Sequence, residues 1–367
     1  MERISEQENL FVQIIALNGM KSLAKERTLQ AFYHILRGRR ANQTLQDVHL
    51  FRLYPYYRLF PHLLREQWGE ILQQLLGQDY IREMDLDRNK TTFVLTTKGE
   101  EVARQGRTAY EVNQWFGLFH EHPWLNGHLT AFWLRLHLMV QTVSYLLMEN
   151  PSFYPVVHDR HIQSFVKLQL HNPGARKRWL EGLFAELYKA LDVLPPNIQS
   201  LLVKQFSGSQ QTALTMQQLA YQEKLPPSFI RIKWRWGVAN VMIQLKENPA
   251  DFPLLASLLP EEQSGALQMS SSAQETYRLL QRQVPIEKIA QIRGITRNTV
   301  EDHLVDIALH DPVWDASSYL TNEARQQILE TSAKLNTRRL RVIKEALHDQ
   351  YSYLQIRLAL AIGEAKS

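Results

Sequence analysis

Arginine side chains are concentrated near the start of the sequence, and they are the clearest candidates for chemistry. Between Lys21 and Arg65, nine Lys and Arg residues stand against only Glu26 and Asp47, which leaves a local net charge of +7. Phosphate groups attract guanidinium groups at such a density. The sequence therefore predicts nucleic-acid contacts here, with a solvated basic face as the alternative. The predicted contact residues of this region are Arg37, Arg39, Arg40, Arg58, Arg65 and Lys90.

Catalytic and metal-binding patterns are absent from the sequence. The chain has no cysteine, which excludes thiolate zinc sites, cysteine nucleophiles and disulfides. The histidines at 120, 122 and 128 and the pair His158 and His161 lack the His-Glu-x-x-His spacing of a helical metal site, and no Gly-x-Ser-x-Gly motif marks a serine nucleophile. We therefore expect no enzyme activity, no metal and no small-molecule cofactor.

Composition indicates a folded chain with several parts. The 367 residues exceed one typical domain, and 44% hydrophobic with 22% charged residues is ordinary globular composition. The first residues lack the apolar stretch of a signal peptide, and Arg135 and His137 interrupt the best candidate for a membrane span. We expect a cytoplasmic, nucleoid-associated protein with no membrane partner.

The strongest local motif lies near residue 290 and predicts a helix-turn-helix. Ala290 supplies the small residue of the first helix, Gly294 the turn and Val300 the buried aliphatic residue of the second helix. Arg297 and Asn298 would be exposed at the start of that second helix, and they are predicted DNA contacts. Acidic and basic residues balance between 273 and 310, so protein binding is an equal alternative.

The same spacing occurs around residue 220, with Lys224 in place of the turn glycine. In the expected second helix, cations alternate with Trp234 and Trp236, a pattern common on nucleic-acid surfaces, although core packing explains the tryptophans about as well. The predicted contacts on this helix are Ser228, Arg231, Lys233 and Arg235.

A winged helix is predicted near the N-terminus. Apolar residues recur at helical spacing through residues 65–76, and two strand-like segments, 80–84 and 92–96, flank a polar turn at 87–90. Residues 65–76 would be the recognition helix, and the turn would be the tip of the wing.

The fold class expected from these patterns is mainly α and multi-domain, with an N-terminal winged helix and small β-hairpin, a helical middle and two further helix-turn-helix units. Proline and glycine positions place the boundaries. The predicted division is a winged-helix domain at 1–107, a helical scaffold at 108–190, a helix-turn-helix unit at 191–248, a linker at 249–270 and a C-terminal helix-turn-helix domain at 271–367.

The C-terminal quarter resembles the helix-turn-helix domain at the end of many bacterial RecQ-family helicases. The residues that carry this resemblance are 277–280 (YRLL), 286–296 (IEKIAQIRGIT), 299–304 (TVEDHL), 343–347 (IKEAL) and 353–361 (YLQIRLALA). Segments 31–40 (AFYHILRGRR), 45–47 and 54–61 (YPYYRLFP) resemble the winged helix that follows the RecQ motor. The phosphate loop and zinc cysteines of those helicases are missing, so ATPase activity is not implied.

In layout the whole chain is similar to the YpbB-type proteins of Gram-positive bacteria, whose genes tend to neighbour a RecQ-family helicase gene. This resemblance implies a non-catalytic accessory protein that binds DNA, as duplex, fork or single strand, and that serves a RecQ-family helicase in trans during repair, recombination or fork processing. A sequence-specific transcriptional regulator is the main alternative, and an adaptor that binds only protein is a weaker one.

Overall fold

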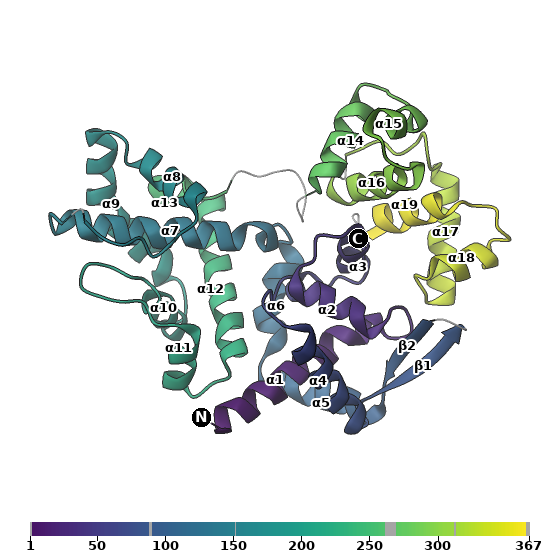
Figure 1. Cartoon of the computed structure of the whole chain (residues 1–367), viewed down its shortest axis with the longest axis horizontal. Coiled ribbons are helices and arrows are strands. Elements are labelled where there is room, and N and C mark those ends of the chain that lie inside the picture. The colour runs from purple at the N-terminus through teal and green to yellow at the C-terminus, as the bar shows by residue number, and fades with distance from the viewer. Residues whose placement is uncertain (1, 88–89, 151, 261–268, 312, 365–367) are drawn as a thin grey trace. The chain divides into compact units, whose positions relative to one another are not determined.

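The computed structural model describes residues 2–87, 90–150, 152–260, 269–311 and 313–364. Within these residues, helices from α1 to α19 account for most of the chain, and two strands form one small antiparallel sheet (Figure 1). The predicted mainly helical class with a small hairpin is confirmed. The chain divides into two compact units, residues 1–12 with 111–262 and residues 13–110 with 263–367.

In the described part of the first unit, all regular secondary structure is helical. It receives the first residues of α1 (Glu2–Met20) and is otherwise built from the segment that follows the hairpin. Its other helices are α6 (Val112–Glu121), α7 (Leu125–Leu147), α8 (Arg160–Gln169), α9 (Pro173–Asp192), α10 (Pro196–Val203), α11 (Met216–Glu223), α12 (Pro227–Glu247) and α13 (Pro253–Ala256).

Helix α12 is the centre of this unit. It packs against α6, α7, α9, α10 and α11, and Val238, Met242 and Leu245 on it are at most 1% exposed. Burial of apolar side chains on several faces is what holds a long helix inside a unit of this size. Helix α13 falls within the predicted linker and packs against α9, where Leu255 is fully buried.

The second unit joins segments from both ends of the chain. From the N-terminal part come the rest of α1, α2 (Leu29–Arg37), α3 (Asn42–Leu50), α4 (Arg65–Gly77), β1 (Ile81–Asp87), β2 (Lys90–Leu95) and α5 (Thr97–Ala109). From the C-terminal part come α14 (Ser271–Gln281), α15 (Ile286–Arg293), α16 (Arg297–His310), α17 (Asn322–Leu335), α18 (Leu340–Ala346) and α19 (Tyr353–Glu364). The predicted five-part division stays a prediction.

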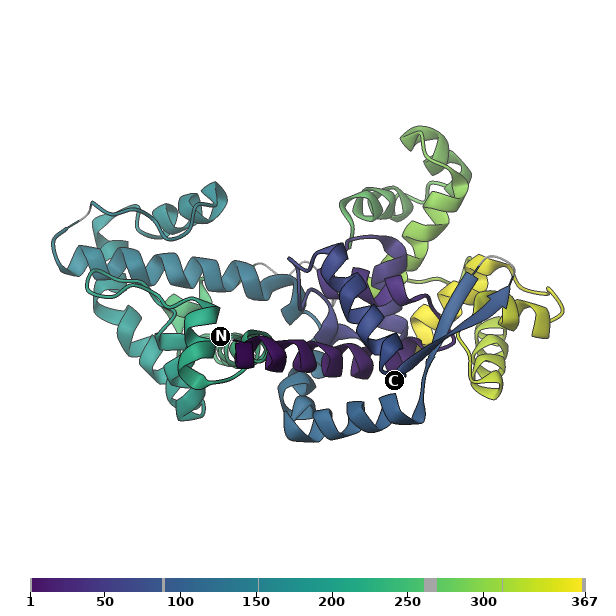
Figure 2. The same cartoon turned by 60° about the horizontal axis from the view of Figure 1, so that its bottom comes forward.

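The N-terminal part of this unit is the predicted winged helix. Trp68 of α4 is fully buried, with its ring 6.1 Å from that of Phe32 on α2. The hairpin follows α4, and its two strands are neighbours in both views (Figure 1 and Figure 2). Ile81 lies opposite Leu95, and Glu83 lies opposite Phe93. Thr96 ends the hairpin and caps α5 by accepting a hydrogen bond from Gly99 N.

Helix α3 connects the winged helix to the C-terminal part. It contacts α2, α16 and α19, and every residue from Thr44 to Leu50 is buried. A helix that is buried on all sides within a small unit indicates that the two chain segments share one core.

Candidate nucleic-acid interface

The end of α2 is shaped by a glycine. Gly38 has φ 72° and ψ 42°, a left-handed conformation that ends the helix and that residues with a side chain seldom adopt. A Cβ at this position would also lie 2.7 Å from the Arg58 side chain. The chain therefore turns sharply after Arg37, and Arg39 and Arg40 follow directly.

Three arginines from different segments surround one histidine. Arg39 Nη1 lies 3.3 Å from His34 Nε2 on α2. Partial burial lowers the pKa of His34, and the positive charges of Arg39, Arg65 and Arg37 lower it further. Arg37 at the end of α2 and Arg65 at the start of α4 therefore lie within electrostatic range of the same imidazole, although 28 positions separate them in the sequence.

Two further arginines lie beside Tyr57, whose hydroxyl donates a hydrogen bond to Gly38 O at 3.3 Å. Burial raises the pKa of Tyr57, while the charges of Arg40 and Arg58 oppose that increase. The Gly38 turn thus gathers the five arginines that the sequence predicted. We call Arg37, Arg39, Arg40, Arg58 and Arg65 the arginine cluster.

The arginine cluster is exposed, and within the described residues no carboxylate neutralises four of its members. All five side chains are exposed, and within the described ranges Arg37, Arg39, Arg58 and Arg65 form no ion pair. Guanidinium groups that remain unpaired at a surface keep their full attraction for phosphate oxygens, which they bind through two parallel hydrogen bonds. The chemistry available here is the binding of a polyanion. Residues 88 and 89, at the tip of the predicted wing, and the side chain of the predicted contact Lys90 lie outside the described residues.

The helix-turn-helix predicted around residue 220 is present as α11, a turn and α12. Thr215 and Gln218 form reciprocal hydrogen bonds at the start of α11, Thr215 N to Gln218 Oε1 at 2.8 Å and Gln218 N to Thr215 Oγ1 at 3.2 Å. Lys224 takes the left-handed turn position, and Ala220 and Ile230, at the places that Ala290 and Val300 hold in the other motif, are buried.

Of the four contact residues predicted on α12, Arg235 requires correction, because its side chain is buried in the first unit, whereas the side chains of Ser228, Arg231 and Lys233 are partly exposed and stay predicted contacts. Arg235 is 6% exposed, donates to Asn126 Oδ1 at 2.7 Å and lies over the Phe119 ring at 4.5 Å. Lys233 lies over the Phe229 and Trp115 rings, at 4.9 and 5.6 Å.

The remaining two predicted contacts on α12 are also engaged within the unit. Ser228 N donates to Glu8 Oε2 at 3.0 Å, its hydroxyl bonds the other oxygen of that carboxylate, and the Arg231 side chain is half-buried. The alternation of cations and rings along α12 therefore reflects packing: guanidinium and ammonium groups are held against aromatic faces by cation–π attraction.

The C-terminal helix-turn-helix has the predicted geometry. Gly294 ends α15 with φ 61° and ψ 33°, and Thr296 caps α16 by accepting a hydrogen bond from Thr299 N at 3.1 Å. Arg297 and Asn298 are exposed on the first turn of α16. Arg297, however, pairs with Glu287 at 3.0 Å and with Glu301 at 3.1 Å, so its charge is balanced locally.

The rest of α16 is covered by protein. All residues from His303 to His310 are buried, including Val305 at 2% and Leu309 at 7% exposed, and the helix contacts α3, α14, α15 and α19. Arg357 of α19 pairs with Glu301 and Asp302. In this structure α16 offers one accessible turn. This covering was not predicted, although Val305 and Leu309, both apolar and on the side of the helix away from Val300, are its signal in the sequence.

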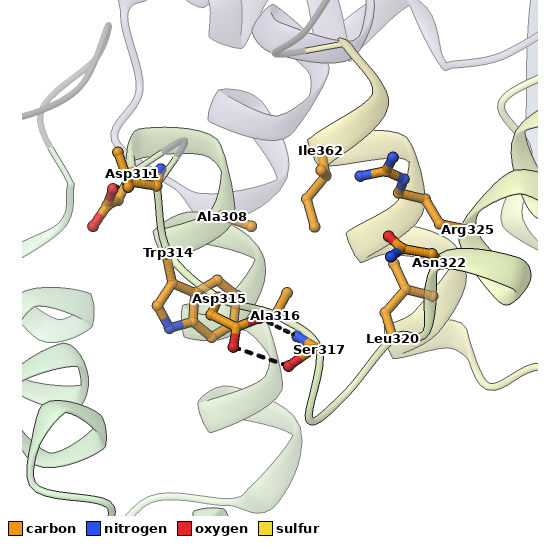
Figure 3. Close-up of a pocket in the computed structure, with 11 residues that line it drawn as sticks. Ala308, Asp311, Trp314, Asp315, Ala316, Ser317, Leu320, Asn322, Arg325 and Ile362 are labelled. Carbon is orange, nitrogen blue, oxygen red and sulfur yellow. Dashed lines mark hydrogen bonds between the residues drawn. The ribbon is translucent and has the colours of Figure 1, made fainter.

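A cavity of about 320 Å³ that the sequence analysis did not anticipate lies beside α16 and α17 (Figure 3). Trp314, Asp315 and Ser317 line it, together with Arg325. Asp315 accepts two hydrogen bonds from Ser317, both at 2.9 Å. Asp311 and Asp315 also line this cavity, and their two negative charges exceed the single positive charge of Arg325 among the described lining residues. The cavity therefore does not attract a polyanion.

No set of three or more His, Asp or Glu side chains is arranged to hold a metal ion in the residues that the structure describes. Nor does any helix there have the length and apolar character needed to cross a bilayer.

Comparison with known proteins finds similarity to a helix-turn-helix family and to one curated protein along most of its length. A family model described as "Helix-turn-helix domain" matches residues 272–360, which include α15, the Gly294 turn and α16. Protein YpbB of Bacillus subtilis (strain 168) is 26% identical over 358 residues, which cover 95% of this chain and 97% of that protein. No solved structure matches the chain. The similarity to YpbB extends through both compact units, and a helix-turn-helix domain indicates DNA binding.

Proposed function

We propose that this chain is a non-catalytic DNA-binding protein whose principal contact is the arginine cluster. The observation that carries the proposal is the convergence of five exposed arginines on the Gly38 turn, four of which have no ion pair in the described structure. Electrostatic attraction to phosphates supplies most nonspecific affinity for DNA. The helix-turn-helix domain at residues 272–360 supports the same function.

We further propose that the DNA-binding protein serves a RecQ-family DNA helicase as an accessory subunit in repair, recombination or fork processing, inside the cytoplasm. The basis is the resemblance of residues 272–362 and 31–61 to the modules that follow the motor in those helicases. A chain that carries such modules without a motor would supply them in trans. The side chains of Asp315 and Glu330 are exposed in the C-terminal part and are candidates for the protein contact.

The alternative is a sequence-specific transcriptional regulator. Asn298 favours it, because this amide is exposed on the first turn of α16 and amide side chains read adenine in the major groove. The covered remainder of α16 weighs against it, since a reading helix normally presents more than one turn to the bases.

The proposal is tested by binding assays on the full chain with fluorescein-labelled duplex, fork and single-strand DNA of mixed sequence. In the triple variant Arg37→Glu, Arg39→Glu, Arg65→Glu, we expect affinity for every substrate to fall by at least about 10-fold and the salt dependence to flatten by about one unit per lost duplex phosphate contact. Arg160→Glu is the control, because Arg160 is exposed at the first position of α8 in the other unit. Unchanged affinity in the triple variant would remove the arginine cluster from the function.

The helicase partnership has its own test. The tagged protein is purified from its host after nuclease treatment, and the bound proteins are identified by mass spectrometry. Recovery of a RecQ-family helicase in near-stoichiometric amount supports the accessory role. Recovery of RNA polymerase, together with one enriched motif in selection from random DNA, supports the regulator instead.

A further inference from the structure

A second cationic site in the same unit is built from residues other than those of the arginine cluster. A cavity of about 510 Å³ is lined on one side by residues 21–26 and Phe51 and on the other by α17, residues 336–338 and α19. This volume is within the range of sites for small molecules or single nucleotides. We call this cavity the basic pocket.

Three cations line the basic pocket: Lys21, Lys25 and Arg338. Lys25 has φ 63°, its backbone N–H donates to Phe93 O at 2.8 Å, and its exposed side chain forms no ion pair in the described structure. Within the part of the chain that the structure describes, Lys21 pairs only with Glu100, at 3.5 Å, and both side chains are about half exposed, so solvent screens that pair. Two ammonium groups are therefore available to an anion.

The single carboxylate among the described lining residues is already engaged. Glu26 Oε1 accepts a hydrogen bond from Thr337 Oγ1 at 2.7 Å, and Arg338 N donates to its Oε2 at 3.3 Å. These bonds join the N-terminal wall of the pocket to the C-terminal wall. The hydrogen bonds from Thr337 and Arg338 partly offset the negative charge of Glu26. The described lining residues therefore keep an excess of positive charge.

The remaining lining groups suit the rest of a nucleotide. The side chains of Ser22 and Asn336 form no hydrogen bond within the described residues and provide a hydroxyl and an amide. Phe51, Leu329 and Leu360 give the pocket an apolar part. Ammonium groups next to a hydroxyl, an amide and an apolar wall match a phosphate that is attached to a sugar and a base.

We propose that the basic pocket binds a nucleotide phosphate, either within a single nucleic-acid strand or as a free nucleotide. The case for a nucleic-acid strand as the source of the phosphate rests on the proposed function, because the arginine cluster of the same unit would bring DNA to this surface. A concave pocket of this size admits a flexible single strand more readily than the convex backbone of a duplex. A ligand held here would contact the N-terminal part of the unit and its helices α17 and α19 at once.

The test compares Lys25→Gln with Lys224→Gln in the full chain. Both lysines are exposed and both have left-handed backbone angles, φ 63° and φ 53°, so the control matches the charge change and the conformational strain. Binding of a labelled 15-nucleotide dT strand is measured from about 50 to 200 mM salt, and binding of dTMP is measured by calorimetry. We expect Lys25→Gln to weaken strand binding about 3-fold and to lower the salt slope by about 0.7, the value for one single-strand phosphate, while Lys224→Gln matches the parent.

Each outcome decides between the sources. If Lys25→Gln weakens strand binding and Lys224→Gln does not, the phosphate belongs to a nucleic-acid strand. If Lys25→Gln loses dTMP binding but keeps the strand affinity of the parent, the ligand is a free nucleotide. Unchanged binding of both ligands overturns the basic pocket. The Arg37→Glu, Arg39→Glu, Arg65→Glu variant is measured alongside: if it binds DNA normally while Lys25→Gln does not, the proposed function fails and the pocket stands.

Discussion

Lys224 and Gly294 occupy the same place in two helix-turn-helix segments of this chain. Lys224 has φ 53° and ψ 39° after α11, and Gly294 has φ 61° and ψ 33° after α15. In both segments the next residue donates its N–H to the carbonyl of the small residue in the first helix, Leu225 to Ala220 at 3.1 Å and Ile295 to Ala290 at 3.0 Å. The two turns have the same backbone, and only one of them has the residue that adopts it without strain.

This relationship predicts opposite effects of two substitutions on stability. Lys224→Gly relieves left-handed strain and should raise the free energy of unfolding by up to about 1 kcal/mol, whereas Gly294→Ala introduces strain and should lower it by about 1 kcal/mol. Among the described residues, a Cβ built at Gly294 meets no atom within 4 Å beyond those of its own local chain, so backbone strain is the effect expected there. Urea denaturation followed by circular dichroism measures both variants. A neutral Gly294→Ala would show that the turn does not hold its left-handed angle in solution.

The sequence predicted these turns because the steric requirement is local: a small residue, a left-handed position and a buried aliphatic residue at fixed spacing. The hairpin was predictable for the same reason, and its strands pair as expected. The environment of α12 was not predictable in this way. Arginine and lysine between tryptophans give the same local pattern whether the helix faces DNA or the core, and only the packing of α6 and α7 against α12 decides.

The interior position of Arg235 gives a second prediction. Arg235→Ala should lower the free energy of unfolding by about 3 kcal/mol, because it removes a buried guanidinium and leaves Asn126 Oδ1 without that donor. DNA affinity of the folded variant should equal that of the parent. Denaturation and fluorescence anisotropy measure the two quantities separately. A stable variant with weakened DNA binding would return Arg235 to the interface.

The covered face of α16 could not be predicted from residues 271–367 alone, since α3, one of the helices that contact it, lies more than 240 positions earlier in the sequence. Val305→Ala should therefore reduce stability by about 2 kcal/mol, the combined effect of lost burial and a cavity. Asn298→Ala, at an exposed position of the same helix, should change stability by less than about 0.5 kcal/mol. Equal and small effects at both positions would mean that the outer face of α16 is open to solvent.

Acid should destabilise the first unit through His137. Burial lowers the pKa of His137 to about 4, and its Nε2 accepts a hydrogen bond from Ser207 N at 3.1 Å, which requires the neutral ring. In the unfolded chain the imidazole has its ordinary pKa of about 6.5, so between about pH 6.5 and pH 4 the unfolded state binds more protons than the folded state. The free energy of unfolding should then fall as the pH is lowered through this window, by up to about 3 kcal/mol from this group.

The measurement is urea denaturation of the parent and of His137→Gln at several pH values from 7 to 4. Gln keeps an oxygen that can accept from Ser207 N but has no proton to gain, so its stability should depend less steeply on pH. His161→Gln is the control, since His161 is exposed and its side chain lies on the surface of α8. If parent and His137→Gln lose stability in parallel, the acid sensitivity arises from other groups, and the neutral His137 ring contributes nothing to it.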